Sequence, residues 1–466
     1  MYTINDIINY FSSIDNINAD NRISHDEYLN AKKTNSIFSE ILTENMEFTD
    51  YCSAFVNKYR DQLDNIDNTN LNECKNLPYK MEKFPEEQDK IWEPITGVLT
   101  KEEVDNQRFD IKTPEGEAIS PNLNFNSEEG LYMLKHLSFD KEAFKDFPKE
   151  NLPKGWNPDE IFELGKDPGM NVRKMHKMGY TGKGITVAAI DTPIILHDGI
   201  KSSLVGYEVM NNAKALNTPA YFHGQAVSDI LCGDETGTAP DSKLVYFAYE
   251  DNKNDGLQAL RRILEINKQA EENNKPENKI RVVSLSWGFD DDMEGYEEFR
   301  TLLKKLYDSG VFVATADFNM LDESITGGKL ALGLLDKKEQ SDNPNDYNNY
   351  RPGVMTPEYY PDNTLFVLSG DRTIASATND QKYRHDSYGS TSWTIPSLAG
   401  IYTCALQCAD EHNVKLTPQM FWDYAYKTGK DMYENENLVG RAIDAEALVN
   451  EIIKNSETDR TRSFGI

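Results

Sequence analysis

The sequence lacks several features that would place it in common classes of protein. It has no run approaching the roughly 20 consecutive apolar residues that span a bilayer, so no transmembrane helix is predicted. Its 49 basic residues are outnumbered by 78 acidic ones, and the formal charge of -29 disfavours binding to nucleic acid or anionic membrane. Its five cysteines include no CxxC pair in a metal-site arrangement, which argues against a zinc-binding domain.

The N-terminus also lacks the pattern of a secretory signal. There is neither a basic start nor an apolar run before Asp6. We therefore expect a cytoplasmic protein with free thiols, and export by a leaderless route stays open. Cys404 and Cys408 lie four residues apart on a predicted helix, where we expect core packing rather than a redox or metal-binding role.

What is present divides the chain into three predicted regions. Residues 1–80 are acidic and carry apolar stripes typical of helices. Residues 81–167 are rich in proline, which favours short strands and turns over long helices. Residues 168–466 alternate apolar strands with helices and form the predicted main domain.

The first region contains a loop that resembles an EF-hand calcium site. Oxygen-bearing side chains occupy loop positions one, three and five (Asn16, Asn18, Asp20), and Glu27 occupies position twelve. Asparagine replaces both the usual first aspartate and the turn glycine. The alternative is an ordinary polar connection between two helices. Ca²⁺ is thus a candidate ligand of these four residues, and no cofactor is expected for the chemistry of the main domain.

The main domain shows a regular alternation of elements after Gly169. Strands are predicted at residues 185–190, 244–248, 281–286 and 311–316, with helices from His223, at 256–272 and at 297–309. This order predicts a parallel sheet with helices on both faces. In such sheets the functional residues gather at the carboxyl ends of the strands. The polar segment 320–355 is expected to be a long loop.

Three stretches of the main domain resemble the motifs of subtilisin-like serine proteases, the subtilases. Residues 184–192 are similar to the aspartate motif, residues 223–227 to the histidine motif and residues 389–400 to the serine motif, in the family order. The resemblance covers residues 168–466. It implies a three-layer α/β/α fold with a mainly parallel sheet, to which the N-terminal helical and mixed extension is added.

The resemblance also implies a serine endopeptidase with a defined role for each residue. Ser392 would attack the peptide carbonyl, His223 would take its proton, and Asp191 would orient the imidazole. Asn319 and the Ser392 N–H would donate to the oxyanion. Taken singly, each residue has a structural explanation as a cap, a turn former or a helix-start residue.

Neighbours of these residues depart from the family pattern. Ser390 occupies a position where glycine is usual, and Trp393 one where methionine is common. Gln225 and Ala226 replace a threonine and a second histidine. The alternative hypothesis is therefore a catalytically impaired pseudoprotease that acts as a peptide-binding or regulatory protein, although none of the reacting groups is lost.

Protein or peptide substrate is expected to bind as an extended strand beside Ser286, Trp287 and Gly288, because an unpaired sheet edge recognises peptide backbone. Phe318 replaces a glycine before the oxyanion asparagine and would favour small side chains in the adjoining pocket. The 167 residues before the main domain are either a removable propeptide that inhibits the site within the same chain or a permanent accessory domain.

Overall fold

A computed structural model of the chain divides into two compact units, Met1–Ile95 and Thr96–Ile466. In the first unit, the described strands β1 (Arg22–Ile23) and β2 (Lys80–Met81) pair in parallel. The residues that the structure describes are 22–23, 80–81, 110–111, 125–126, 130–131, 134, 137–141, 143–144 and 147–463, except for 212, 218–221, 250–252, 290–292, 317–330, 354–363, 376–382, 388–389 and 435. The domain boundaries predicted at residues 80 and 167 stay predictions.

The second unit is organised around a parallel sheet. Its described strands, in spatial order, are β6 (Leu204–Val209), β7 (Lys243–Ala248), β5 (Thr186–Asp191), β8 (Ile280–Leu285) and β9 (Phe312–Thr315). All neighbouring pairs in this sheet are parallel. The helices between successive strands are α9 (Phe222–Cys232), α10 (Lys253–Glu272) and α11 (Tyr296–Asp308). The predicted alternation of strands and helices is therefore confirmed.

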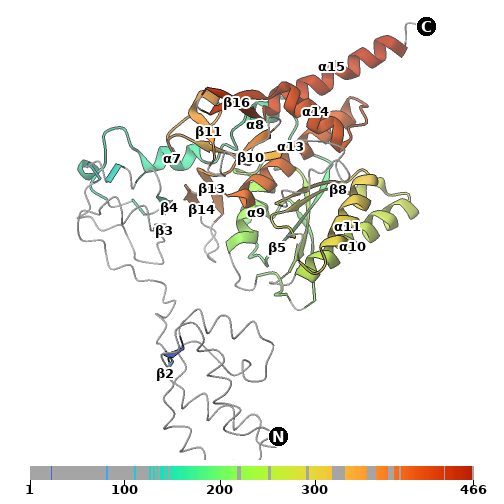
Figure 1. Ribbon diagram of the computed structural model, residues 1–466, viewed down its shortest axis with the longest axis horizontal. Helices are drawn as coiled ribbons and strands as arrows, with labels where there is room; N and C mark the ends of the chain where they lie inside the picture. Colours follow the sequence, from blue (N-terminus) through green and yellow to red (C-terminus); the bar gives the residue numbers. More distant parts are fainter. Residues whose placement is uncertain are drawn as a thin grey trace, which may run out of the picture. The chain divides into compact units, whose positions relative to one another are not determined.

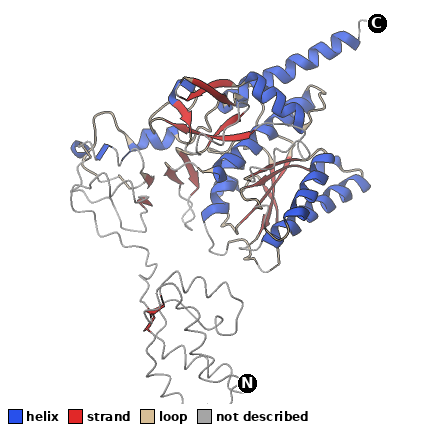
Figure 2. Cartoon of the chain, in the orientation of Figure 1, coloured by secondary structure: helices blue, strands red, loops and turns tan. Residues whose placement is uncertain are grey.

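Helices cover both faces of this sheet (Figures 1 and 2). Every residue of β5 is buried, and successive residues contribute to two different cores. Val187 and Ala189 belong to the core that includes the long helix α13 (Thr391–Glu411), whereas Ala188 and Ile190 belong to the core of α10 and α11. This is the three-layer α/β/α arrangement that the sequence predicted, and it explains why β5 is continuously apolar.

A second sheet lies C-terminal to the first in sequence. Its order is β11 (Tyr350–Pro352), β10 (Ala331–Lys337), β12 (Thr364–Leu368), β16 (Asn437–Ala442) and β15 (Lys430–Glu434). The segment 320–355 is thus not simply a long loop, because it contains β10 and β11. That prediction was wrong, since the short apolar run 331–335 pairs with β12 in the core while polar residues surround it.

Helices of the C-terminal half pack into the same main core. They are α13, α14 (Pro418–Thr428) and α15 (Ala445–Ser463), together with α8 (Val172–Lys177) from before the parallel sheet. Cys404 and Cys408 of α13 are buried in this core as expected, and burial raises the pKa of Cys408 to about 12. None of the helices within the described ranges is long and apolar enough to cross a membrane. The cytoplasmic location stays a prediction.

A third sheet joins part of the predicted extension to the main domain. Its order is β13 (Arg372–Ala375), β14 (Tyr383–Asp386), β4 (Ser138–Asp140) and β3 (Asp110–Ile111). Helix α7 (Pro158–Leu164) follows β4 and is capped by Asn157, whose side chain accepts from Asp159 N. Short 3₁₀ helices are η2 (Lys149–Asn151), η3 (Asp198–Ile200), η4 (Pro276–Asn278) and η6 (Tyr347–Asn349).

Candidate active site

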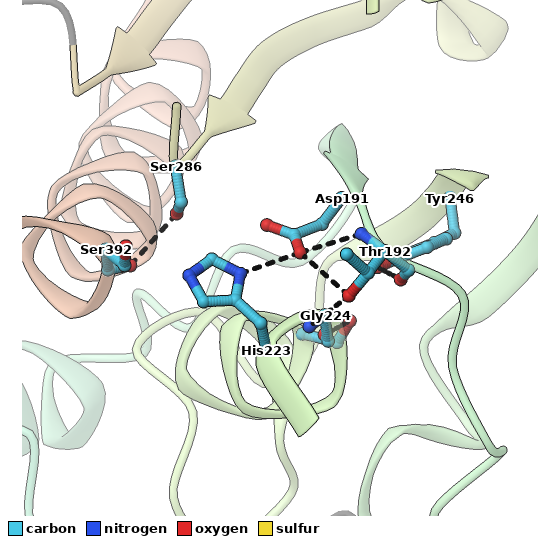
Figure 3. A network of polar contacts seen from close by, with 8 residues as sticks. Asp191, Thr192, His223, Gly224, Tyr246, Ser286 and Ser392 are labelled. Atoms are coloured by element: carbon cyan, nitrogen blue, oxygen red, sulfur yellow. Dashed lines mark hydrogen bonds and ion pairs between the residues drawn. The ribbon is translucent and has the colours of Figure 1, made fainter. Parts of the chain in front are cut away.

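The carboxylate and the imidazole predicted to work together do lie together. Asp191 ends β5 and is 1% exposed, whereas the side chain of His223 in the first turn of α9 is 31% exposed. The two side chains form a hydrogen bond in which His223 Nδ1 lies 2.8 Å from Asp191 Oδ1 (Figure 3). A buried carboxylate therefore fixes one edge of a ring whose other edge is accessible.

Thr192 forms hydrogen bonds with the Asp191 side chain and with the backbone next to His223. Its backbone N–H donates to Asp191 Oδ1 at 2.8 Å, and its hydroxyl lies 3.3 Å from the same oxygen. The hydroxyl also accepts from the backbone N–H of Gly224, directly after the histidine (3.0 Å). One residue thus joins the end of β5 to the start of α9, a contact that the sequence motif contained but did not reveal.

Position 224 requires glycine because neighbouring atoms occupy the space that a Cβ would take. A Cβ at this position would lie 2.2 Å from Thr192 O and 2.2 Å from the hydroxyl of Tyr246. That hydroxyl donates to Thr192 O at 2.5 Å (Figure 3). Tyr246 belongs to the predicted strand 244–248, and this role was not predicted. The available signal was a polar hydroxyl in an otherwise apolar strand, since a buried tyrosine usually finds a partner for its O–H.

The environment of His223 favours its charged form. Burial lowers the pKa of the ring, but the charge of Asp191 and the hydrogen bond that the ring donates to its carboxylate raise it more. The net pKa of His223 lies above its ordinary value of 6.5. An imidazole tuned in this direction is a stronger base when it is neutral, which suits proton abstraction from a hydroxyl.

Ser392 occupies the second position of α13, after the N-cap residue Ser390. At this position a backbone N–H has no acceptor within its own helix, and the positive end of the helix favours negative charge. Ser390 has φ -148° and ψ 159°, an extended conformation open to any residue. Serine in place of the usual glycine therefore does not strain this turn.

The carbonyl of Ser392 accepts a hydrogen bond from a residue that follows strand β8. In a regular helix it would accept from the N–H four residues later, but that residue is Pro396, which has none. Ser286 Oγ donates to the Ser392 carbonyl instead, at 2.9 Å (Figure 3). The end of β8 and the start of α13 are thereby joined, and sequence analysis had not assigned this role to Ser286.

The start of α13 faces the accessible side of His223. The ring of Trp393 lies 5.3 Å from the His223 ring, centroid to centroid, at an interplanar angle of 32°. Among the residues that the structure describes, no hydrogen bond joins Ser392 Oγ to His223. Catalytic hydrogen bonds of this kind are often long without substrate and tighten in the substrate complex.

Residues predicted to bind substrate follow β8. The carbonyl of Trp287 accepts from Thr315 Oγ1 of the neighbouring β9 at 2.7 Å, and Gly288 comes next in the chain. The indole of Trp287 stacks on Phe299, with centroids 5.8 Å apart, in the core formed with α10 and α11. Substrate binding by Ser286, Trp287 and Gly288 stays a prediction.

The remaining predicted site residues lie outside the described part of the chain. They are Asn319 and Phe318 beside the proposed oxyanion site, and the candidate calcium ligands Asn16, Asn18, Asp20 and Glu27. Their roles stay predictions. Within the described ranges, no group of three or more His, Cys, Asp or Glu side chains is arranged to hold a metal ion.

Comparison with known proteins finds a matching family and one similar curated protein. A family model described as the subtilase family matches residues 182–419. The serine protease AprX of Bacillus subtilis (strain 168) is 25% identical over 304 residues, which make up 58% of this chain and 67% of AprX.

Two solved structures are similar to part of this chain at low identity. The prenylagaramide maturation protease PagA has 13% identity and a TM-score of 0.43, with 60% of this chain and 98% of that chain covered. Fervidolysin from Fervidobacterium pennivorans, a keratinolytic enzyme related to subtilisin, has 13% identity and a TM-score of 0.45, with 64% of this chain and 48% of that chain covered.

Proposed function

Because this chain belongs to the subtilase family of serine proteases, we propose that Asp191, His223 and Ser392 are its catalytic triad and that it acts as an endopeptidase. The observation that carries this proposal is the 2.8 Å hydrogen bond from His223 to the buried Asp191, with the start of α13 on the other side of the ring. The three residues come from the end of β5, the first turn of α9 and the first turn of α13, and Figure 3 draws them in one view.

The proposed reaction begins with attack of Ser392 Oγ on the carbonyl carbon of a peptide bond. His223 Nε2 takes the hydroxyl proton as the bond forms and then gives it to the leaving amine. Water hydrolyses the resulting acyl-enzyme by the same proton transfers. Asp191 stays ionised, holds the ring with Nδ1 protonated, and stabilises the imidazolium that forms at each step.

The oxyanion of the tetrahedral intermediate is proposed to sit at the start of α13. The Ser392 N–H would be one donor, supported by the positive end of the helix. The side chain of Asn319 would be the second donor, and its loss would cost about 3 kcal/mol of transition-state stabilisation.

Substrate is proposed to lie as an extended strand beside residues 286–288. Backbone hydrogen bonds would then bind peptides of many sequences, and the pockets would set the preference. Phe318 is proposed to make the pocket before the scissile bond shallow. Matched peptides with alanine or phenylalanine at that position would test this, and faster cleavage after phenylalanine would refute it.

Two of the departures that prompted the pseudoprotease alternative are accommodated. Ser390 adopts an extended conformation without strain, and Trp393 is buried against Ala226 and Val227 of α9. Neither substitution removes a reacting group. Turnover is therefore the better supported function of the site.

The proposal is tested by covalent labelling of the full chain with a fluorophosphonate probe. Labelling is expected in the natural sequence, absent in Ser392→Ala and strongly reduced in His223→Ala. Ser390→Gly is the matched control, because it changes the neighbouring serine to the residue that is usual in the family and should keep the labelling. Equal labelling of Ser392→Ala and the natural sequence would refute the assignment.

A further inference from the structure

A strand of the N-terminal extension is part of the sheet that precedes the candidate nucleophile. Strand β4 pairs antiparallel with β14, with Phe139 opposite His385 and Asp140 opposite Arg384. The Phe139 and His385 rings are both buried, and their centroids lie 5.3 Å apart. Strand β14 ends six residues before Ser392, so this pairing lies close to the site in sequence.

A line of side-chain contacts leads from β4 toward the catalytic histidine. Ser138 Oγ donates to Asp386 Oδ1 at 3.1 Å, and both side chains are buried. Trp393 Nε1 donates to the other oxygen, Asp386 Oδ2, at 3.2 Å. The Trp393 ring in turn contacts the ring of His223. One carboxylate therefore connects a hydroxyl of the extension to the indole beside His223.

This carboxylate depends on its donors. A buried carboxylate is costly unless hydrogen bonds satisfy its oxygens, and Asp386 is only 6% exposed. Ser138 Oγ also accepts from the backbone N–H of Ser387 at 3.1 Å. Removing the Ser138 hydroxyl would thus weaken two contacts in the segment that leads to Ser392.

The indole is also fixed on its other sides. Trp393 is 4% exposed and packs against Ala226, Val227 and Ile230 of α9 and against Ile374. Because α9 also carries His223, the indole lies between the helix of the base and the helix of the nucleophile. A hydrogen bond that fixes the rotation of this indole also fixes one wall of the His223 site.

The extension makes further contacts with the main domain, including the antiparallel pair (hairpin) of β13 and β14. These contacts indicate a specific interface. Thr373 N donates to Gly165 O at 2.8 Å, and Thr373 Oγ1 donates to Phe162 O at 2.6 Å. Outside β13 and β14, Gln340 Nε2 from the segment between β10 and β11 donates to Leu137 O at 3.0 Å. Aromatic rings of the extension pack on one another and give it a local core, namely Phe125, Phe139, Phe144, Phe147 and Trp156.

We propose that Ser138, Asp386 and Trp393 are positioning residues for His223, and that β4 is therefore retained in the active enzyme. This rests on the proposed function of His223 and Ser392. Of the two roles predicted for residues 1–167, it assigns a permanent one to the part that contains β4. Removal of residues 1–167 would take away a hydrogen-bond donor of Asp386 and uncover the buried ring of His385.

The test compares kcat and KM of full-length variants on one peptide substrate. Ser138→Ala and Asp386→Asn are expected to lower kcat about 10- to 100-fold, the range for a small misplacement of a catalytic group, and to change KM less than twofold. Thr373→Ala is the matched control, because it removes another buried hydroxyl between the extension and the same hairpin without leading to Trp393. Its kcat should change less than twofold.

Trp393→Phe tests the hydrogen bond, because it keeps an aromatic ring beside His223 but removes the N–H that binds Asp386 together with part of the indole. The effect of Ser138→Ala on kcat should largely disappear in this background. If Ser138→Ala lowers kcat no more than Thr373→Ala, or by the same factor in both backgrounds, the positioning role is refuted. Ser138→Ala, Thr373→Ala and Trp393→Phe still test the proposal if Asp386→Asn fails to fold.

Intact mass of the fluorophosphonate-labelled species tests retention directly. The labelled species is expected to contain residue 138, whereas a labelled species that begins after residue 167 would overturn the proposal. Absence of any labelling in the natural sequence would instead refute the proposed function. The two failures are therefore distinguishable.

Discussion

The two halves of the candidate site are held in different ways. Asp191 and His223 are fixed by residues next to them in sequence, since Thr192 and Gly224 each adjoin one of the pair. Ser392 is fixed by contacts from far along the chain, because Ser286 lies 106 residues before it. The Asp-His half is thus held by the residues that adjoin its own two members, which lie 32 positions apart, whereas the serine half is held from 106 positions away.

Because of this difference, substitutions in the two halves should act in different ways. In the Asp-His half, one substitution acts directly on the tautomer and the charge of the base. In the serine half, a substitution acts through geometry, and another contact can in principle replace the one lost.

The largest effect is expected from Asp191→Asn, which breaks the Asp-His half. An asparagine would favour the wrong imidazole tautomer, so kcat should fall about 10⁴-fold. Thermal unfolding should show that the variant is folded. Steady-state kinetics of the natural sequence and the variant check this, and a loss below tenfold would show that Asp191 does not orient the base.

Gly224→Ala is expected to act on the same half through packing. The new Cβ would lie 2.2 Å from Thr192 O, a backbone atom that cannot move aside cheaply. Overpacking of this kind costs about 1–3 kcal/mol in the free energy of unfolding. Denaturant unfolding measures it, with Gly206→Ala as the control, because a Cβ at that position would lie no closer than 3.5 Å to its neighbours and φ there is not positive. A neutral Gly224→Ala would contradict the tight packing.

Ser286→Ala tests the serine half and is expected to be milder. The Ser392 carbonyl would lose its donor, and we expect kcat to fall about tenfold, corresponding to roughly 1.4 kcal/mol. Adding Pro396→Ala supplies the missing helical N–H and should recover part of that loss. If the double variant is no better than Ser286→Ala, the hydrogen bond to the carbonyl is not what positions Ser392.

The smallest effect is expected in the pH profile. Only neutral His223 can accept the proton, so kcat/KM should rise with pH through the pKa of His223. Because Asp191 raises this pKa above 6.5, the midpoint of the acid limb should lie above 6.5. In Asp191→Asn the raising charge is gone and the midpoint should move to lower pH. A midpoint below 6.5 in the natural sequence would contradict the coupling.

The parts of the site that the sequence predicted are those that depend on short motifs. The motifs around Asp191 and His223 are local, and the alternating apolar runs place β5, β7, β8 and β9 within one or two residues of their observed ends. The family order of motifs then identified Ser392 as the third member. These features depend on residues close together in the chain.

What could not be predicted depends on contacts between distant segments. No local pattern shows that Ser286 replaces the helical N–H missing at Pro396, or that β4 pairs with β14. Strand β10 was missed because its run is short and polar residues flank it, and it is stabilised by pairing with β12. Long-range pairing is decided by the whole core and not by local periodicity.

The most direct test of the account is to locate the fluorophosphonate on the labelled full-length chain by peptide mass spectrometry. We predict a single adduct on Ser392 that forms at least tenfold more slowly in Asp191→Asn, as expected for a hydroxyl activated by an oriented base. An adduct on a different residue, or labelling of Ser392 at an unchanged rate in Asp191→Asn, would contradict the triad.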